Sequence, residues 1–84
     1  MDKEAVKLNE QAIELSSRGN YKEAIACFLG AIHIEKKNGL LWYNLGITYR
    51  DSGDLQAAKN ALFQAHKLDS DNVEILVQKS YQTG

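Results

Sequence analysis

The chain has 84 residues, of which 44% are hydrophobic and 25% charged, so it suits one small folded domain and is not a disordered charged tail. Ten basic and eleven acidic residues leave a net charge of -1, which lacks the basic excess that binds nucleic acid or anionic lipid. No apolar run approaches the roughly 18 residues of a membrane span, and the polar start lacks a signal-peptide core, so we expect a cytoplasmic protein without a membrane partner.

Five helices are expected in chain order, over residues 4–17, 21–36, 39–52, 55–68 and 72–82. In the third of these, Trp42, Leu45, Gly46 and Tyr49 recur at i, i+3, i+4 and i+7, which places them on one helical face. Gly19 and Gly53 can adopt the left-handed conformation that ends a helix, and we expect Asn20 and Asp54 to cap the helices that follow. No strand pattern is present.

The sequence also repeats itself with a period of 34 residues. This offset pairs identical residues at five positions: Ile13 with Ile47, Gly19 with Gly53, Ala24 with Ala58, Ala31 with Ala65, and Asn38 with Asn72. Every pair falls where a helical hairpin needs a turn glycine, a small contact residue or an apolar residue. The period therefore predicts two equivalent helical hairpins.

The segment from Trp42 to Tyr49 resembles the W-x2-L-G-x2-Y opening of the tetratricopeptide repeat, and Ala24 with Phe28 matches its A-x3-F step. The family often has proline after the second helix, and this chain has none. The resemblance implies an all-α fold, a right-handed α-α superhelix of two helix-turn-helix repeats plus a C-terminal capping helix. The units are 5–38, 39–72 and 73–84, the last being a capping helix or a truncated third repeat. Polar Lys7, Gln11 and Glu14 occupy the face toward a preceding repeat, so none is expected there.

The resemblance further implies a scaffold that binds another protein or peptide in a concave groove formed by the first helix of each repeat. Helical angle places these residues in the groove: Asn9, Ile13, Tyr43, Asn44, Ile47, Arg50, Val77, Gln78 and Tyr81, with Val6, Glu10, Ser17, Leu40 and Asp51 on the same surface. A contiguous exposed apolar strip is typical of an interaction site. Alternatively, Val77 and Tyr81 fold over to close the short array.

Some relatives bind the acidic carboxyl termini of heat-shock chaperones through a clamp of cations and asparagines. The corresponding residues here are Asn9, Ile13, Asn44, Glu74 and Gln78, of which only Asn44 matches. Because this set has no cation to pair with a terminal carboxylate, we do not expect this chain to bind chaperone tails.

A second interpretation places the interaction surface on the convex face. Ile25, Leu29 and Phe63 are apolar on the outer side of the second helices, and Phe63 follows Leu29 by one period. These residues would serve homo-oligomerisation, as in a homodimer.

Catalytic and metal-binding patterns are missing from the sequence. Cys27, His33 and His66 lack the spacing of a zinc site, and no glycine-rich phosphate loop occurs. We therefore expect no enzyme activity, no catalytic residues, no metal and no cofactor.

Overall fold

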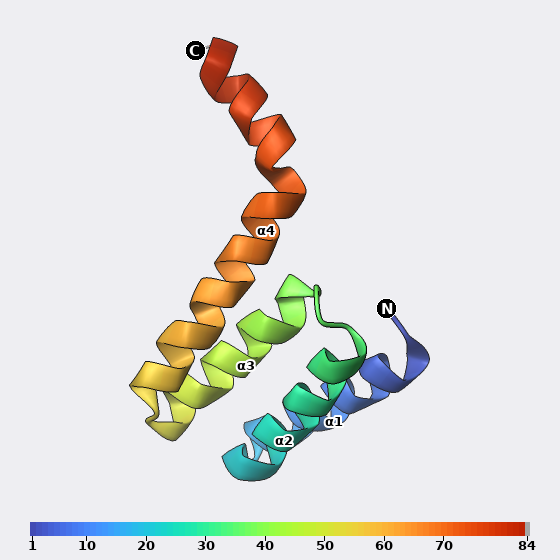
Figure 1. Ribbon diagram of the computed structural model, residues 1–84. Coiled ribbons are helices and arrows are strands. Elements are labelled where there is room, and N and C mark those ends of the chain that lie inside the picture. Colours follow the sequence, from blue (N-terminus) through green and yellow to red (C-terminus); the bar gives the residue numbers. More distant parts are fainter. Residues whose placement is uncertain (84) are drawn as a thin grey trace.

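The structure is a computed structural model that describes the backbone of residues 1–83 and the side chains of residues 1–69. In this part of the chain all regular structure is helical: α1 Lys3–Ser17, α2 Tyr21–Ile34, α3 Gly39–Ser52 and α4 Leu55–Thr83. Figure 1 shows two hairpins side by side, α1 with α2 and α3 with α4. The predicted all-α fold is confirmed.

The turns of the two hairpins have the same geometry one period apart. At the end of α1, Gly19 has φ 83°, and the amides of Gly19 and Asn20 donate to the carbonyls of Ser16 and Leu15 at 3.0 and 2.9 Å. At the end of α3, Gly53 has φ 94°, and the amides of Gly53 and Asp54 donate to Arg50 and Tyr49, both at 3.0 Å. Both glycines thus supply the left-handed residue of a Schellman motif, as the sequence predicts.

The predicted helix caps are only partly correct. Asp54 accepts a hydrogen bond from the amide of Ala57 at 3.1 Å, as predicted. Asn38, which was not among the predicted caps, accepts from the amide of Leu40 at 3.0 Å. Asn20 stands at the N-cap of α2, but its side chain makes no capping hydrogen bond.

The core lies between the helices of both hairpins. Phe28, Leu41 and Leu45 are the largest fully buried side chains, and small residues such as Ala12 and Ala24 allow close helix approach around them. Trp42 is half-buried against this core, and its indole nitrogen donates to the carbonyl of Lys36 at 3.1 Å. Phe28 and Trp42, both residues of the tetratricopeptide-like motifs, thus contribute to the core.

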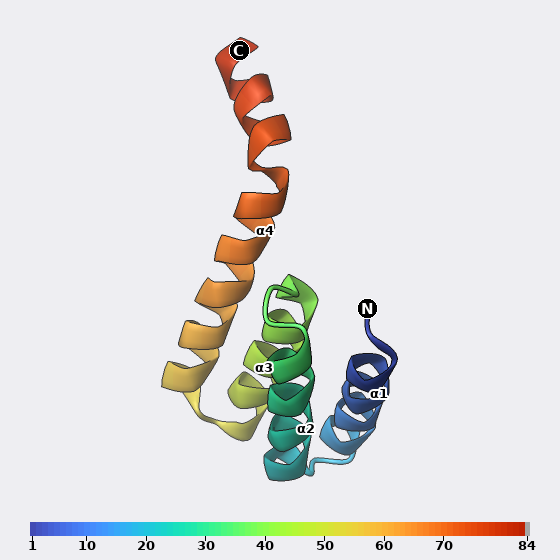
Figure 2. The same ribbon diagram turned by 45° about the vertical axis from the view of Figure 1, so that its right-hand side comes forward.

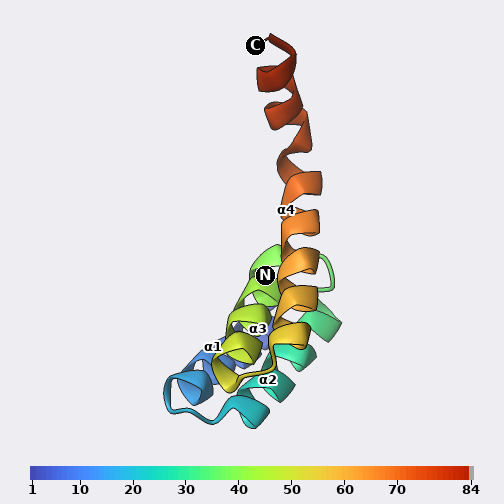
Figure 3. The ribbon, with the colours of Figure 1, turned by 90° about the vertical axis from the view of Figure 1, so that its left-hand side faces the viewer.

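The structure differs from the prediction after residue 68. The expected break before a fifth helix at 72–82 does not occur, and the residues assigned to a capping helix continue α4 as far as Thr83. The physical reason is local: neither glycine nor proline lies between Gly53 and Gly84, so no strong helix terminator interrupts the segment. In Figures 1, 2 and 3 the C-terminal half of α4 projects past the other helices.

Candidate functional site

The first helices of the two hairpins, α1 and α3, form one wall of the molecule. They are joined by a hydrogen bond in which the side-chain amide nitrogen of Asn44 donates to Oδ1 of Asn9 at 3.2 Å. Both asparagines are half-buried, and each side-chain amide has more donor and acceptor capacity than this one bond uses. The structure thus brings together two of the residues that helical angle places in the groove.

A hollow of about 300 Å³ lies beside this asparagine pair, toward the C-terminal ends of α1 and α3. Its lining residues are Ile13, Ser16, Ser17, Phe28, Asn44, Ile47, Thr48 and Asp51. Ile13 is 49% exposed, whereas Phe28 and Thr48 are buried and form the floor. The hollow therefore offers an apolar surface with polar atoms around it, a combination typical of ligand sites.

Three lining residues were not among the predicted groove residues: Ser16, Phe28 and Thr48. Phe28 belongs to α2, the second helix of its hairpin, whereas the groove was expected to be formed by first helices only. Ser16 follows Ile13 by three positions and Thr48 follows Asn44 by four, so helical spacing could have indicated both.

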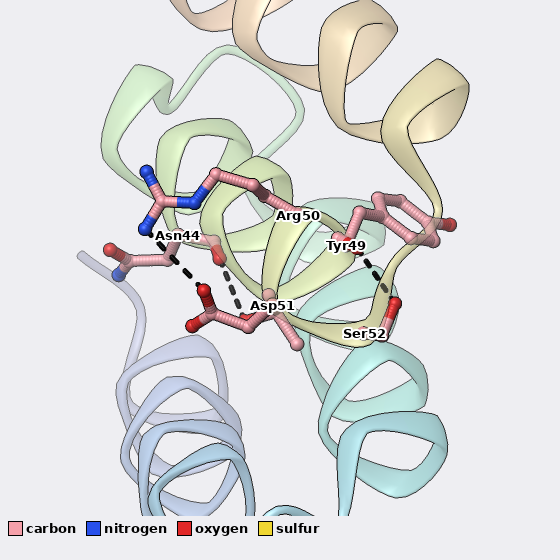
Figure 4. A network of polar contacts seen from close by, with 6 residues as sticks. Asn44, Tyr49, Arg50, Asp51 and Ser52 are labelled. Carbon is pink, nitrogen blue, oxygen red and sulfur yellow. Dashed lines mark hydrogen bonds and ion pairs between the residues drawn. The ribbon is translucent and has the colours of Figure 1, made fainter.

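Polar side chains in the second half of α3 form a network of contacts (Figure 4). Arg50 contacts Asp51 at 3.4 Å between Nη2 and Oδ1, and both side chains remain partly exposed. Thr48 donates its hydroxyl proton to the carbonyl of Asn44 at 2.9 Å. Of the charged pair, only Asp51 lines the hollow.

The structure describes the side chains of only some of the remaining predicted groove residues. Tyr43 is 51% exposed on α3 and lies outside the lining of the hollow. Val77, Gln78 and Tyr81, together with Glu74 of the chaperone comparison, lie outside the residues whose side chains the structure describes.

The three residues of the predicted convex surface have different environments. Ile25 is half-buried and packs against the core. Leu29 is 45% exposed and borders a second hollow of about 310 Å³, which is lined by Leu29, Trp42, Leu45, Tyr49, Ala57, Asn60, Ala61 and Gln64. Phe63 is 66% exposed and does not line that hollow.

A larger and open hollow of about 910 Å³ follows the connection between α2 and α3. It is lined by residues 33–40 and Asp69, most of them polar or main-chain groups of the connection. Such a solvated surface offers less to a ligand than the mixed lining between α1 and α3.

Two further observations concern metals and membranes. Among the described residues, no group of three His, Cys, Asp or Glu side chains is placed to hold a metal ion. Within the same part of the chain, no helix combines the length and the apolar character needed to cross a bilayer.

Two helical hairpins with matching turns and a shared core define a helical repeat protein. A family model described as tetratricopeptide repeat matches residues 27–60, so this segment is similar to one tetratricopeptide repeat. The match spans the predicted boundary between the units 5–38 and 39–72. A periodic array of helices can be divided into repeats from any starting residue, so this offset is compatible with the predicted units. No curated protein and no solved structure gives a significant match. Tetratricopeptide repeats are scaffolds that generally mediate protein–protein interaction.

Proposed function

We propose that this domain binds a segment of a partner protein in the groove between α1 and α3. The observation that supports this function best is the hollow beside the Asn9–Asn44 pair, where partly exposed Ile13 and Ile47 line the same surface as the side-chain amide of Asn44. Apolar contacts supply affinity, while amides recognise the main chain of a peptide by donating to carbonyls and accepting from N–H groups. An affinity near 1 μM, about -8 kcal/mol, is expected for such a short contact.

The test is selection from a random-peptide display library on the immobilised domain, followed by titration of an enriched peptide into isotope-labelled protein. We expect the largest amide shifts at residues of α1 and α3 that line the hollow. Ile47→Glu should weaken binding at least tenfold, because it places an uncompensated charge against the apolar part of the ligand.

Leu55→Glu is the matched control, since Leu55 is 67% exposed at the start of α4 and lines none of these hollows. This variant should bind like the wild type. Peptides whose binding depends on Leu55 and is unaffected by Ile47→Glu would overturn the proposal.

A second candidate function is self-association through the convex face, which is favoured by the high exposure of Phe63 and the exposed side chain of Leu29 beside an apolar hollow. Light scattering coupled to size exclusion tests it. A homodimer that Leu29→Glu and Phe63→Glu each convert to a monomer would support it. A monomeric wild type at high micromolar concentration would exclude it.

A further inference from the structure

The hollow between α1 and α3 lies at a position in the fold where the electrostatic potential is expected to be negative. Apart from Phe28 of α2, its lining residues come from the last two turns of α1, which ends at Ser17, and from the corresponding turns of α3, which ends at Ser52. Figure 1 shows the two helices running in the same direction, so both C-terminal ends lie at this end of the groove. A helix carries about half a negative charge at its C-terminus, and two such ends favour a cationic ligand.

The side chains at the hollow add negative charge of their own. Asp51 is its charged lining residue, and the Asp51 side chain is 42% exposed. Arg50 contacts Asp51 at 3.4 Å but does not line the hollow, and 56% of its own side chain is exposed. A long contact between two exposed side chains contributes little, so a ligand cation can replace Arg50 at the carboxylate.

Two of the hydroxyl groups that line the hollow, those of Ser17 and Thr48, are already donors within their own helices. Ser17 donates its hydroxyl proton to the carbonyl of Glu14 at 2.7 Å, and Thr48 donates to the carbonyl of Asn44 at 2.9 Å. A carbonyl oxygen can only accept, so each proton is committed within its own helix and the oxygen lone pairs remain. Lysine and arginine side chains, which only donate hydrogen bonds, match such a set.

We infer that this hollow selects a basic side chain, lysine or arginine, in the bound segment. The aliphatic part of that side chain lies along Ile13 and Ile47, as long basic side chains commonly do on apolar surface, and its charged end contacts Asp51. This inference rests on the proposed function, since it specifies one position of the segment that the groove binds.

The experiment titrates four single-residue probes into isotope-labelled protein at low salt: the N-acetyl methylamides of lysine, arginine, norleucine and glutamate. We expect the lysine and arginine probes to shift the amides of Ile13, Ser17, Ile47 and Asp51. They should bind about fivefold more tightly than norleucine, which is the upper range for one partly exposed ion pair. The glutamate probe should bind most weakly, and added salt should remove the advantage of the cations.

Asp51→Asn tests the carboxylate directly and should reduce the lysine probe to the affinity of norleucine. Glu23→Gln is the control, because it removes one negative charge, as Asp51→Asn does, from an exposed side chain of α2 outside the hollow. This variant should still bind the lysine probe more tightly than norleucine. If norleucine binds the wild type as tightly as lysine, or Asp51→Asn retains the preference, the selectivity is wrong while the groove function stands. If no probe shifts these amides, the hollow takes no side chain, and both proposals fail.

Discussion

Asn44 and Asn9 are hydrogen-bonded across α3 and α1 at 3.2 Å between Nδ2 and Oδ1, directly beside the hollow of the groove. The bond joins the two hairpins through polar side chains on a surface where the helices otherwise contact each other sparsely. The same two side chains therefore contribute to the stability of the repeat stack and to the proposed binding surface.

Asn44→Ala should lower the free energy of unfolding by about 0.5–1.5 kcal/mol, because one partly buried hydrogen bond is lost. Urea unfolding followed by circular dichroism measures this change. In a double-mutant cycle with Asn9→Ala, we expect a coupling of at least about 0.5 kcal/mol. Additive effects of the two substitutions would show that the bond does not persist in solution.

Gly46→Ala should lower the free energy of unfolding by about 1–2 kcal/mol, although alanine is the better helix former. An added Cβ would lie 2.7 Å from Cγ and Cδ2 of Leu62 and 3.2 Å from its main-chain nitrogen, so α3 and α4 would have to separate. Thermal and urea unfolding measure the loss. The Leu62→Ala background should reduce the penalty of Gly46→Ala, because it removes the closest side-chain atoms.

Gly39→Ala provides the matched comparison, since Gly39 is also buried in α3. Its added Cβ would lie 2.6 Å from Oδ1 of Asp69, the mobile end of a side chain, and 3.4 Å from the carbonyl of Ala65, an ordinary contact. Asp69 can rotate away, so we expect a change within about 0.5 kcal/mol. Equal penalties at both glycines would contradict the role assigned to Leu62.

Gly53→Ala and Gly19→Ala should each cost about 1 kcal/mol of unfolding free energy, the penalty of left-handed backbone for a residue with a Cβ. No heavy atom lies within 4 Å of the added Cβ at either position, so the cost comes from the backbone alone. Asparagine tolerates this conformation better, and Gly53→Asn should therefore be the milder change. Chemical unfolding of the three variants checks the order, and an alanine variant as stable as the wild type would refute it.

Trp42→Phe should lower the free energy of unfolding by about 1 kcal/mol, because it removes the indole donor to the carbonyl of Lys36. Trp42→Ala should cost about 3 kcal/mol, the low end for this substitution, since the ring is half-buried. The total free energy of unfolding of a domain of this size is on the order of 4–12 kcal/mol. Circular dichroism is the suitable probe, since both variants lack the only tryptophan. A Trp42→Phe variant less stable than Trp42→Ala would contradict this order.

The sequence by itself determined the helices up to the start of α4 and the two turns between the helices of each hairpin. Those features depend on local chemistry: apolar spacing, and glycines that adopt positive φ at Gly19 and Gly53. The end of α4 was predicted incorrectly: a break was expected before residue 72, but no glycine or proline lies there to end the helix.

Only the tertiary structure decided how the groove is built. The hollow combines Phe28 of α2 with residues of α1 and α3, which come together only when the helices pack. Helical angle can place a residue on a face, but it cannot give the separation of two packed helices. That separation depends on contacts between helices, such as the hydrogen bond between Asn9 of α1 and Asn44 of α3.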